Sequence, residues 1–173
     1  MKILKYLLYA IIILIMIALA TALVLPKTFT AQGESIINKP ASEVYEYVRK
    51  IKSQEDFTVW FKKDPNMIKN YYGTDGTIGG GLKWQSKIVG NGEQVITGLV
   101  DNKKVGINLF LNDSKDAAKF NFTIDSLAPG QAKVIQSVEG AIAFPFNLMM
   151  LFYNMDADFQ KNADQLKQVM ESK

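Results

Sequence analysis

The C-terminal third of the chain carries an apolar stripe at helical spacing. From Pro145 to about Glu171 we expect one long amphipathic helix. Its stripe consists of Leu148, Phe152, Met155, Phe159, Ala163, Leu166 and Met170. The helix follows a series of strand-like segments, so its apolar face needs a sheet to pack against. A curved sheet that grips one long helix often leaves a lined cavity between them, and such a cavity suits a small apolar ligand.

The residues before that helix predict an α+β fold. Thr28 to Ile37 reads as a first strand, Pro40 opens a helix, and a pattern resembling a capping box at residues 53–56 suggests a second short helix. Further strands are expected at residues 67–72, 82–89, 93–101, 104–112, 118–126 and 133–140. Asn91-Gly92 is a two-residue hairpin signal. We therefore expect a curved antiparallel sheet of six to seven strands wrapped around a long C-terminal helix, with two short helices after the first strand.

The N-terminal residues 1–26 predict a transmembrane helix. From Tyr6 to Leu25 the chain has 20 residues without a charge, enough to span about 30 Å of hydrocarbon. Lys2 and Lys5 precede this run, which favours a single-pass protein with a cytoplasmic N-terminus and an extracytoplasmic domain at residues 27–173.

A cleaved signal peptide is the alternative reading of the same residues. Small residues stand two apart in Ala18-Leu19-Ala20 and again in Ala20-Thr21-Ala22, as at signal cleavage sites. The apolar run continues to Leu25 and is longer than the hydrophobic region of a usual signal peptide, so we favour an uncleaved anchor.

Composition excludes several kinds of chemistry. The chain has no Cys and no His, which excludes disulfides, thiolate nucleophiles, Cys/His zinc sites and catalytic triads built on imidazole. Of the 20 basic residues, Lys2 and Lys5 precede the apolar run, and the remaining 18 nearly balance 17 acidic ones. Without a basic stripe, nucleic acid is not an expected partner. The sequence predicts neither a cofactor nor a metal site.

Several short stretches, taken in order, resemble a known superfamily. They are residues 35–48 (SIINKPASEVYEYV), Trp60, Asp64-Pro65, residues 76–79 ahead of Lys83-Trp84, residues 133–140, and Leu166-Lys167. This ordered set resembles the START-like or SRPBCC superfamily, the polyketide cyclase-type proteins with a helix-grip fold. The resemblance implies a hydrophobic cavity between sheet and helix. Members include lipid and hormone carriers, aromatase and cyclase enzymes, and chaperone-activating domains, and they share no catalytic motif, so no catalytic residue is assigned.

Aromatic and Met side chains are the candidates to line the cavity, and ordinary core packing is the competing reading for each of them. They are Trp60, Tyr72, Trp84, Phe110, Phe120, Phe122, Met149, Phe152, Tyr153, Met155 and Phe159. Polar candidates on the strands are Asn108, Asn121, Asp125, Gln136 and Glu139. By alternation with Phe120 and Phe122, we expect Asn121 and Asp125 to face water.

The sequence thus predicts a membrane-anchored protein that binds a small hydrophobic or amphipathic, lipid-like molecule, with the membrane as a second partner. One alternative is a cyclase, dehydratase or hydrolase that uses the same cavity, which needs a carboxylate or Tyr facing inward, such as Glu139 or Tyr72. Another is a protein-interaction module of the chaperone-activator kind, with a filled core and an exposed apolar patch.

Overall fold

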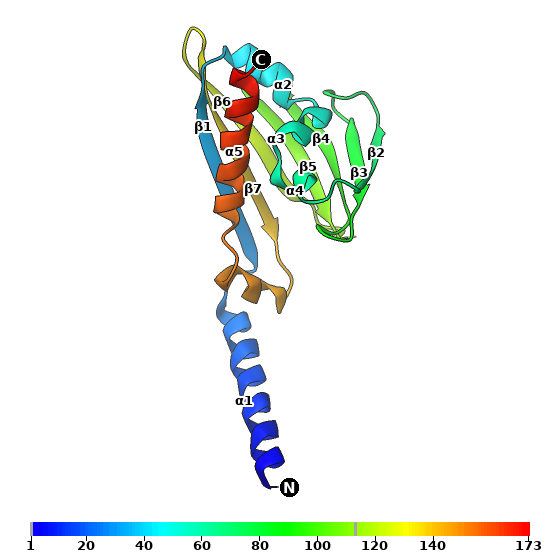
Figure 1. Cartoon of the computed structure of the whole chain (residues 1–173), viewed down its shortest axis with the longest axis vertical. Helices are drawn as coiled ribbons and strands as arrows, with labels where there is room; N and C mark the ends of the chain where they lie inside the picture. The colour runs from blue at the N-terminus through cyan, green and yellow to red at the C-terminus, as the bar shows by residue number, and fades with distance from the viewer. Residues whose placement is uncertain (1, 113) are drawn as a thin grey trace. The chain divides into compact units, whose positions relative to one another are not determined.

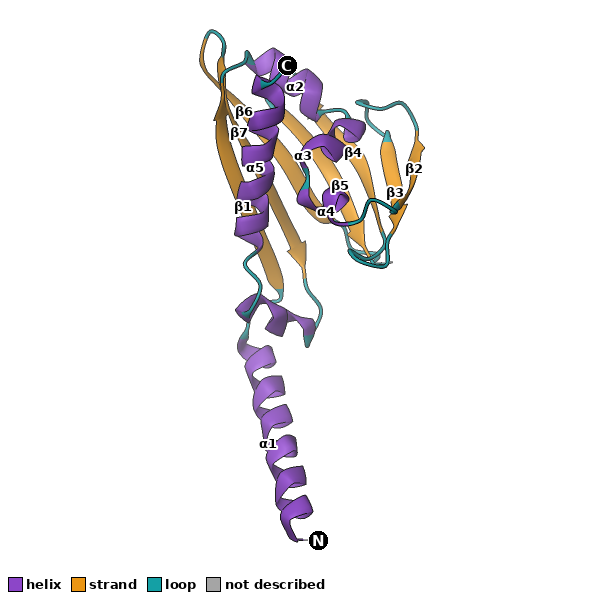
Figure 2. Cartoon of the chain, in the orientation of Figure 1, coloured by secondary structure: helices purple, strands orange, loops and turns teal. Residues whose placement is uncertain are grey.

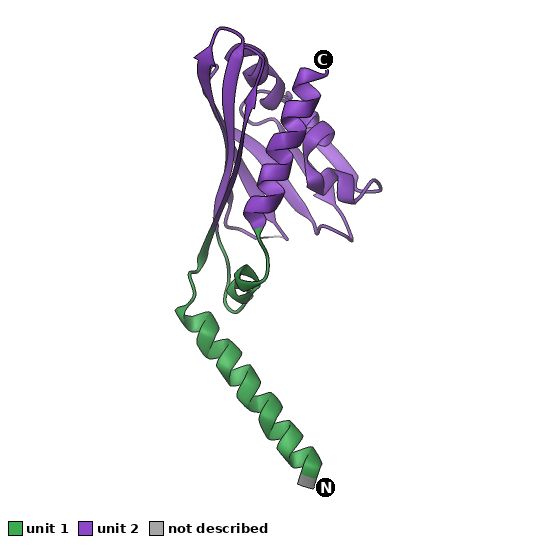
Figure 3. Ribbon diagram, turned by 60° about the vertical axis from the view of Figure 1, so that its left-hand side comes forward, with its two compact units in different colours: residues 1–29, 141–154 green, residues 30–140, 155–173 purple. Residues whose placement is uncertain are grey.

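The computed structural model describes residues 2–112 and 114–173 (Figure 1). In chain order the elements are α1 (Lys2–Val24), β1 (Thr28–Ile37), α2 (Ala41–Val48), η1 (Ile51–Ser53), α3 (Gln54–Phe57), α4 (Val59–Lys63), β2 (Ile68–Tyr72), β3 (Gly81–Gln85), β4 (Gly92–Val100), β5 (Lys104–Leu111), β6 (Ala118–Ala128), β7 (Gln131–Ala141), η2 (Phe146–Leu151) and α5 (Met155–Glu171). They divide into two compact units: residues 1–29 with 141–154 (unit 1), and residues 30–140 with 155–173 (unit 2) (Figure 3).

Unit 2 is a curved sheet with helices over one face (Figure 2). The seven strands have the order β1-β7-β6-β5-β4-β3-β2, so the first strand of the chain lies beside the last. The strands from β2 to β7 pair antiparallel with their sequence neighbours. The predicted α+β helix-grip architecture is confirmed.

Alternation along β6 and β7 builds the core face of this sheet. Every second side chain of β6 from Ala118 to Ile124 is buried, and so is every second one of β7 from Ala132 to Val138. Asp125 on the opposite face is exposed and Asn121 is only half-buried, as alternation predicts. The core face is therefore the one that the helices cover.

Helix α5 covers the free edge of β1. Two backbone N–H groups of this edge strand and that of the residue after it donate to side-chain oxygens of α5, in the pairs Gln32–Asp156 (2.8 Å), Glu34–Gln160 (3.2 Å) and Asn38–Glu171 (2.9 Å). The carbonyls of Glu34 and Ile36 accept from Gln160 and Lys167. An uncovered edge strand invites pairing with another chain. Here the polar side chains of α5 occupy the backbone groups of the β1 edge and so cover it.

The same helix begins ten residues later than the sequence predicts. Residues 146–151 form the short helix η2, and α5 starts only at Met155. The Asn147 amide of η2 donates to the carbonyls of Ala22 and Leu25 within unit 1. The start of α5 has a sequence signal that the apolar stripe obscures, namely Asp156 and Asp158 in its first turn, where acidic side chains favour a helix N-terminus.

Two local predictions are wrong. Strand β3 ends at Gln85, and a six-residue loop replaces the predicted Asn91-Gly92 hairpin, because the Ser86 hydroxyl accepts from Ile88 and Val89 and donates to Asp64. The capping box at residue 53 is also absent from the described residues: the Ser53 hydroxyl donates to the carbonyls of Tyr47 and Lys50 instead.

Unit 1 contains α1 and the segment around η2. Residues Ile3–Val24 of α1 are long and apolar enough to cross a membrane, judged by length and composition. Only 6% of the most apolar window is buried. The Ile142 amide donates to the Lys27 carbonyl (2.9 Å), which ties the segment after β7 to the residues after α1.

Candidate functional site

Five aromatic rings form a continuous chain through the interior of unit 2. Phe57 of α3 meets Phe122 of β6 edge-on at 6.2 Å between centroids, and Phe122 meets Phe120 at 4.9 Å. Phe120 contacts Phe159 of α5 at 6.0 Å, and Phe159 contacts Trp60 of α4 at 5.5 Å. The first four rings are buried, whereas Trp60 is half-exposed. The chain of rings therefore runs from the centre of the core to the surface beside α4.

The structure brings together four of the predicted lining residues and separates others. Trp60, Phe120, Phe122 and Phe159 belong to the ring chain. Trp84 pairs with Phe61 at 6.5 Å. Phe110 on β5 and Met155 at the start of α5 are half-buried. A further group, which consists of Met149, Phe152 and Tyr153, belongs to unit 1 and is exposed.

Sequence reasoning missed two members of the aromatic interior, Phe57 and Phe61. Both follow the Glu55-Asp56 pair within five residues, in a stretch too short for a helical period to show. Their signal was composition alone: two Phe residues flanking Trp60 in a segment of short helices.

Buried amides interrupt this apolar interior. Gln54, Gln94, Gln136 and Asn162 are 0–4% exposed. Among the described residues, both polar atoms of the Gln136 side chain lack a hydrogen-bond partner, as do the Nε2 atoms of Gln54 and Gln94 and the Nδ2 atom of Asn162. Asn162 is partly satisfied, since its Oδ1 accepts from the Val59 amide at 2.8 Å.

Gln136 is the most informative of these amides. It lies on β7 directly opposite Phe122 in the strand register, so it faces the same interior as the ring chain. Buried polar groups in native proteins almost always have partners. A Gln whose two polar atoms both lack protein partners is expected to meet water or a bound molecule. Gln136 lies two residues from both Val134 and Val138, so the period of a strand places all three side chains on the same, inward face.

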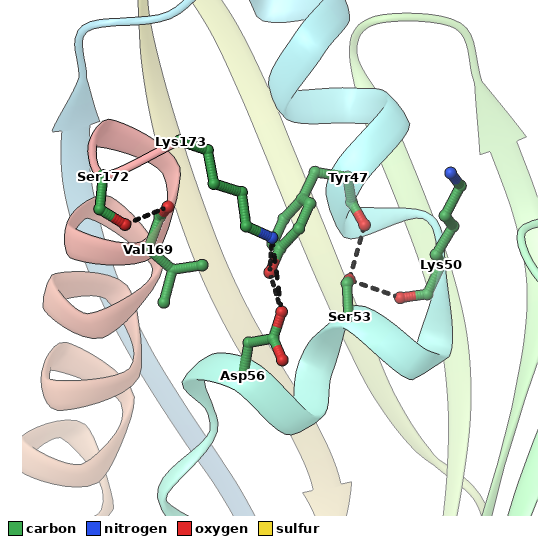
Figure 4. Close-up of polar contacts among 7 residues, drawn as sticks. All are labelled: Tyr47, Lys50, Ser53, Asp56, Val169, Ser172 and Lys173. Carbon is green, nitrogen blue, oxygen red and sulfur yellow. Dashed lines mark hydrogen bonds and ion pairs between the residues drawn. The ribbon is translucent and has the colours of Figure 1, made fainter.

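Polar clusters outside the core combine a Tyr, a carboxylate and a Lys. In one, the Tyr47 hydroxyl donates to Asp56 (2.6 Å) and accepts from the Lys173 ammonium (3.2 Å), which lies 4.3 Å from the Tyr47 ring centroid (Figure 4). Lys173 and Asp56 are about half exposed, so this cluster contributes little to stability. It joins the end of the chain to α2 and α3.

A second cluster centres on Glu55 of α3. Lys69 and Tyr71 of β2 both donate to its carboxylate. Burial acts to raise the pKa of Glu55, but the hydrogen bonds from Lys69 and Tyr71 outweigh it, so the pKa is lowered from 4.5. Burial and the hydrogen bond to Glu55 raise the pKa of Tyr71.

This arrangement predicts a pH dependence of stability. The folded pKa of Glu55 lies below its unfolded value, so the stabilisation is present above pH 4.5 and is lost as the pH falls through the folded pKa. We expect the urea midpoint of Glu55→Gln to fall less than that of wild type when the pH is lowered from above 4.5 to below it. Tyr71→Phe, which removes one donor, should fall between the two. Identical acid dependence in all three proteins would contradict the role of Glu55.

A third cluster contains Tyr72, one of the two side chains named for the enzyme alternative. Its hydroxyl donates to Glu93 (2.6 Å), which also pairs with Lys83 (3.4 Å). Burial and the bond to Glu93 raise the pKa of Tyr72. The phenol therefore stays protonated near neutral pH and acts as a donor. Glu139, the other predicted group, is exposed at the end of β7.

Metal ligands do not converge in the part of the chain that the structure describes. Across residues 2–112 and 114–173, no group of three or more Asp or Glu side chains is placed to hold an ion.

Comparison with known proteins places the fold. No protein-family model and no curated protein matches the sequence. Among solved structures, norcoclaurine synthase from Thalictrum flavum, in complex with dopamine and hydroxybenzaldehyde, is similar with a TM-score of 0.60 and 10% identity, over 84% of this chain and 87% of that one. The Aha1 dimer from Colwellia psychrerythraea gives a TM-score of 0.58 and 14% identity, over 83% and 96% of the two chains. Protein CV1439 from Chromobacterium violaceum gives 0.56 and 14%, over 82% and 96%.

These solved structures are Bet v1-like, or SRPBCC-like, proteins. At such low identity the similarity establishes the fold alone. Unit 2 thus has the helix-grip fold that these structures share.

Proposed function

We propose that this protein is a membrane-anchored binding protein for a small hydrophobic or amphipathic molecule. The ligand would lie between the sheet and α5 and contact the aromatic side chains that continue from Phe122 toward Trp60. The observation that carries the proposal is Gln136, a fully buried amide with no protein partner, set opposite Phe122. Ligand sites of this type are mostly apolar, with a few polar groups that orient the ligand.

The ligands of one similar structure support this kind of site. Norcoclaurine synthase holds dopamine and hydroxybenzaldehyde, two small aromatic molecules, in the same fold. The enzyme alternative is less favoured for this chain, because neither side chain named for it faces the aromatic interior: the Tyr72 hydroxyl donates to Glu93 outside the core, and Glu139 is exposed.

Helix α1 supports anchorage in a membrane. Its described side chains are almost all exposed, and an uncharged, mostly apolar surface that runs from Tyr6 to Val24 is stable in lipid rather than in water. Two apolar residues of the same helix that illustrate this are Ile3 (85% exposed) and Val24 (83% exposed). A ligand taken from the adjacent bilayer would need no soluble carrier.

Native mass spectrometry of the full chain, released from membranes in a mild detergent, tests the proposed binding. We expect a co-purifying mass other than detergent that denaturation releases. A clean mass of the chain alone, even after incubation with a membrane lipid extract, would refute the proposal.

Gln136→Met is a sharper test, because Met matches Gln in length and removes both polar atoms. We expect the ligand-free chain to gain about 1 kcal/mol of unfolding free energy, since an unpaired buried amide is costly. We also expect the variant to retain less of the co-purifying molecule. Gln131→Met on the same strand is the control: the Gln131 amide has a protein partner, Asn38 at 3.0 Å, so its loss should stabilise nothing. Destabilisation by Gln136→Met would mean that the amide is already satisfied without ligand.

A further inference from the structure

The segment that connects β7 to α5 has an unusual surface. From Gly140 to Met155 it contains no charged residue. Seven of its large apolar side chains are exposed to between 40% and 88%, namely those of Phe144, Phe146, Met149, Met150, Leu151, Phe152 and Tyr153. We call residues 144–153 the apolar loop. Soluble surfaces rarely gather so many exposed apolar side chains, and where they do, the patch marks a contact with a partner or a membrane.

The apolar loop is bonded to the end of α1 within unit 1. The Asn147 Nδ2 group donates to the Ala22 carbonyl at 2.7 Å and approaches the carbonyls of Leu25 and Pro26 at 3.3 and 3.4 Å. Asn147 and Ala22 are both fully buried. These are carbonyls at the C-terminal end of the helix, where intrahelical partners run out.

The hydrogen bonds from Asn147 bear on whether the end of α1 lies in water or in lipid. Water satisfies free carbonyls at no cost when a helix ends in solvent. In a bilayer each unsatisfied carbonyl costs several kcal/mol, so the protein must supply the donors itself. A buried amide directed at the last turn of α1 is therefore the arrangement expected where that turn lies within or next to lipid.

We propose that the apolar loop enters the same membrane leaflet as the C-terminal end of α1 and forms a second, interfacial membrane contact. The partner is the lipid bilayer: the loop is continuous with the proposed anchor through Asn147, is uncharged over 16 residues, and carries the Phe, Met and Tyr side chains that suit the headgroup boundary. This inference rests on the proposed anchorage by α1. It assigns to Met149, Phe152 and Tyr153 a contact with lipid rather than with the ligand.

Site-directed fluorescence of the full chain in phosphatidylcholine vesicles tests the loop. Because the chain has no Cys, single labels are placed by Phe152→Cys and Phe146→Cys in the loop, Ile12→Cys in α1, and Ile88→Cys as a control. The loop positions are 88% and 62% exposed and the control is 66% exposed, so labels there do not disturb packing. Each label is tested with a lipid-linked quencher and with aqueous iodide.

We expect labels at 12, 146 and 152 to be quenched by the lipid-linked quencher and protected from iodide, with emission shifted to shorter wavelength than at 88. Lipid quenching at 12 together with iodide quenching at 146 and 152 would overturn the inference and leave the anchor intact. Iodide quenching at all positions would refute the anchor itself. Protection of 146 and 152 from both quenchers would overturn the inference too, because protein rather than lipid would then cover the loop.

Discussion

Gly33→Ala should lower the free energy of unfolding of unit 2 by about 3 kcal/mol or more, the upper end of the usual cost of overpacking. A Cβ at Gly33 would lie 2.3 Å from the backbone carbon and oxygen of Phe159 and 2.4 Å from the Gln160 nitrogen. These are backbone atoms of α5, which cannot move aside as a flexible side chain would. The helix would have to leave β1, and with it the bonds that cover the edge strand, including that from the Glu34 amide to Gln160.

Urea unfolding of the chain in mild detergent measures this effect, with Trp60 and Trp84 as fluorescent probes of unit 2. Gly98→Ala is the matched control, because a Cβ there meets nothing within 4 Å and the residue has no positive φ. We expect that change to be neutral or to stabilise by less than about 1 kcal/mol, since it restricts the unfolded chain. Equal stabilities of the two variants would show that α5 does not lie against β1.

Phe122→Ala should cost about 3–5 kcal/mol, the usual range for a Phe truncated in a core. Phe122 is fully buried and lies at the junction between Phe57 and Phe120 in the ring chain. Its loss leaves a space beside Gln136, the amide proposed to meet the ligand. Because both polar atoms of Gln136 lack protein partners, we expect the amide to draw water into this space.

The same urea titration measures this second effect. Phe152→Ala removes the same atoms from a side chain that is 88% exposed, and it should change the stability of unit 2 by no more than about 0.5 kcal/mol. A cost for Phe122→Ala as small as that of Phe152→Ala would mean that the interior around Phe122 is loosely packed. The ring chain would then not be the core described above.

The features behind the proposed ligand binding lie in unit 2, and those behind the proposed membrane contacts lie in unit 1. Unit 2 holds the aromatic interior, its unpaired amides and the polar clusters around Tyr47, Glu55 and Tyr72. Unit 1 holds the apolar helix and the apolar loop. An exposed apolar patch also fits the interaction-module alternative, and the Aha1 dimer shares the fold. The quenching experiment separates a lipid-covered loop from a protein-covered one.

The candidate site was only partly predictable. Phe120, Phe122 and Phe159 were identified because alternation and helical spacing show which residues share a face. Phe152 was assigned to the same cavity because the predicted helix begins at Pro145, and Met149 because its flexible side chain suits a ligand site, but the structure places both in another unit. The lack of hydrogen-bond partners for Gln136 could not be predicted from the sequence, because it depends on which groups the rest of the fold brings near the amide.

The sequence by itself determined most of the strands, the α+β class and the apolar N-terminal helix, because each depends on the periodicity or length of a local apolar pattern, while the helix-grip fold followed from the resemblance to a known superfamily. Only the tertiary structure decided where α5 begins, how the loop after Gln85 turns, and what covers the edge of β1. Those features depend on single hydrogen bonds between residues far apart in the chain, such as Asn147 to Ala22, Ser86 to Asp64 and Glu34 to Gln160. A local pattern carries no information about such partners, so the long-range bond overrides the local preference.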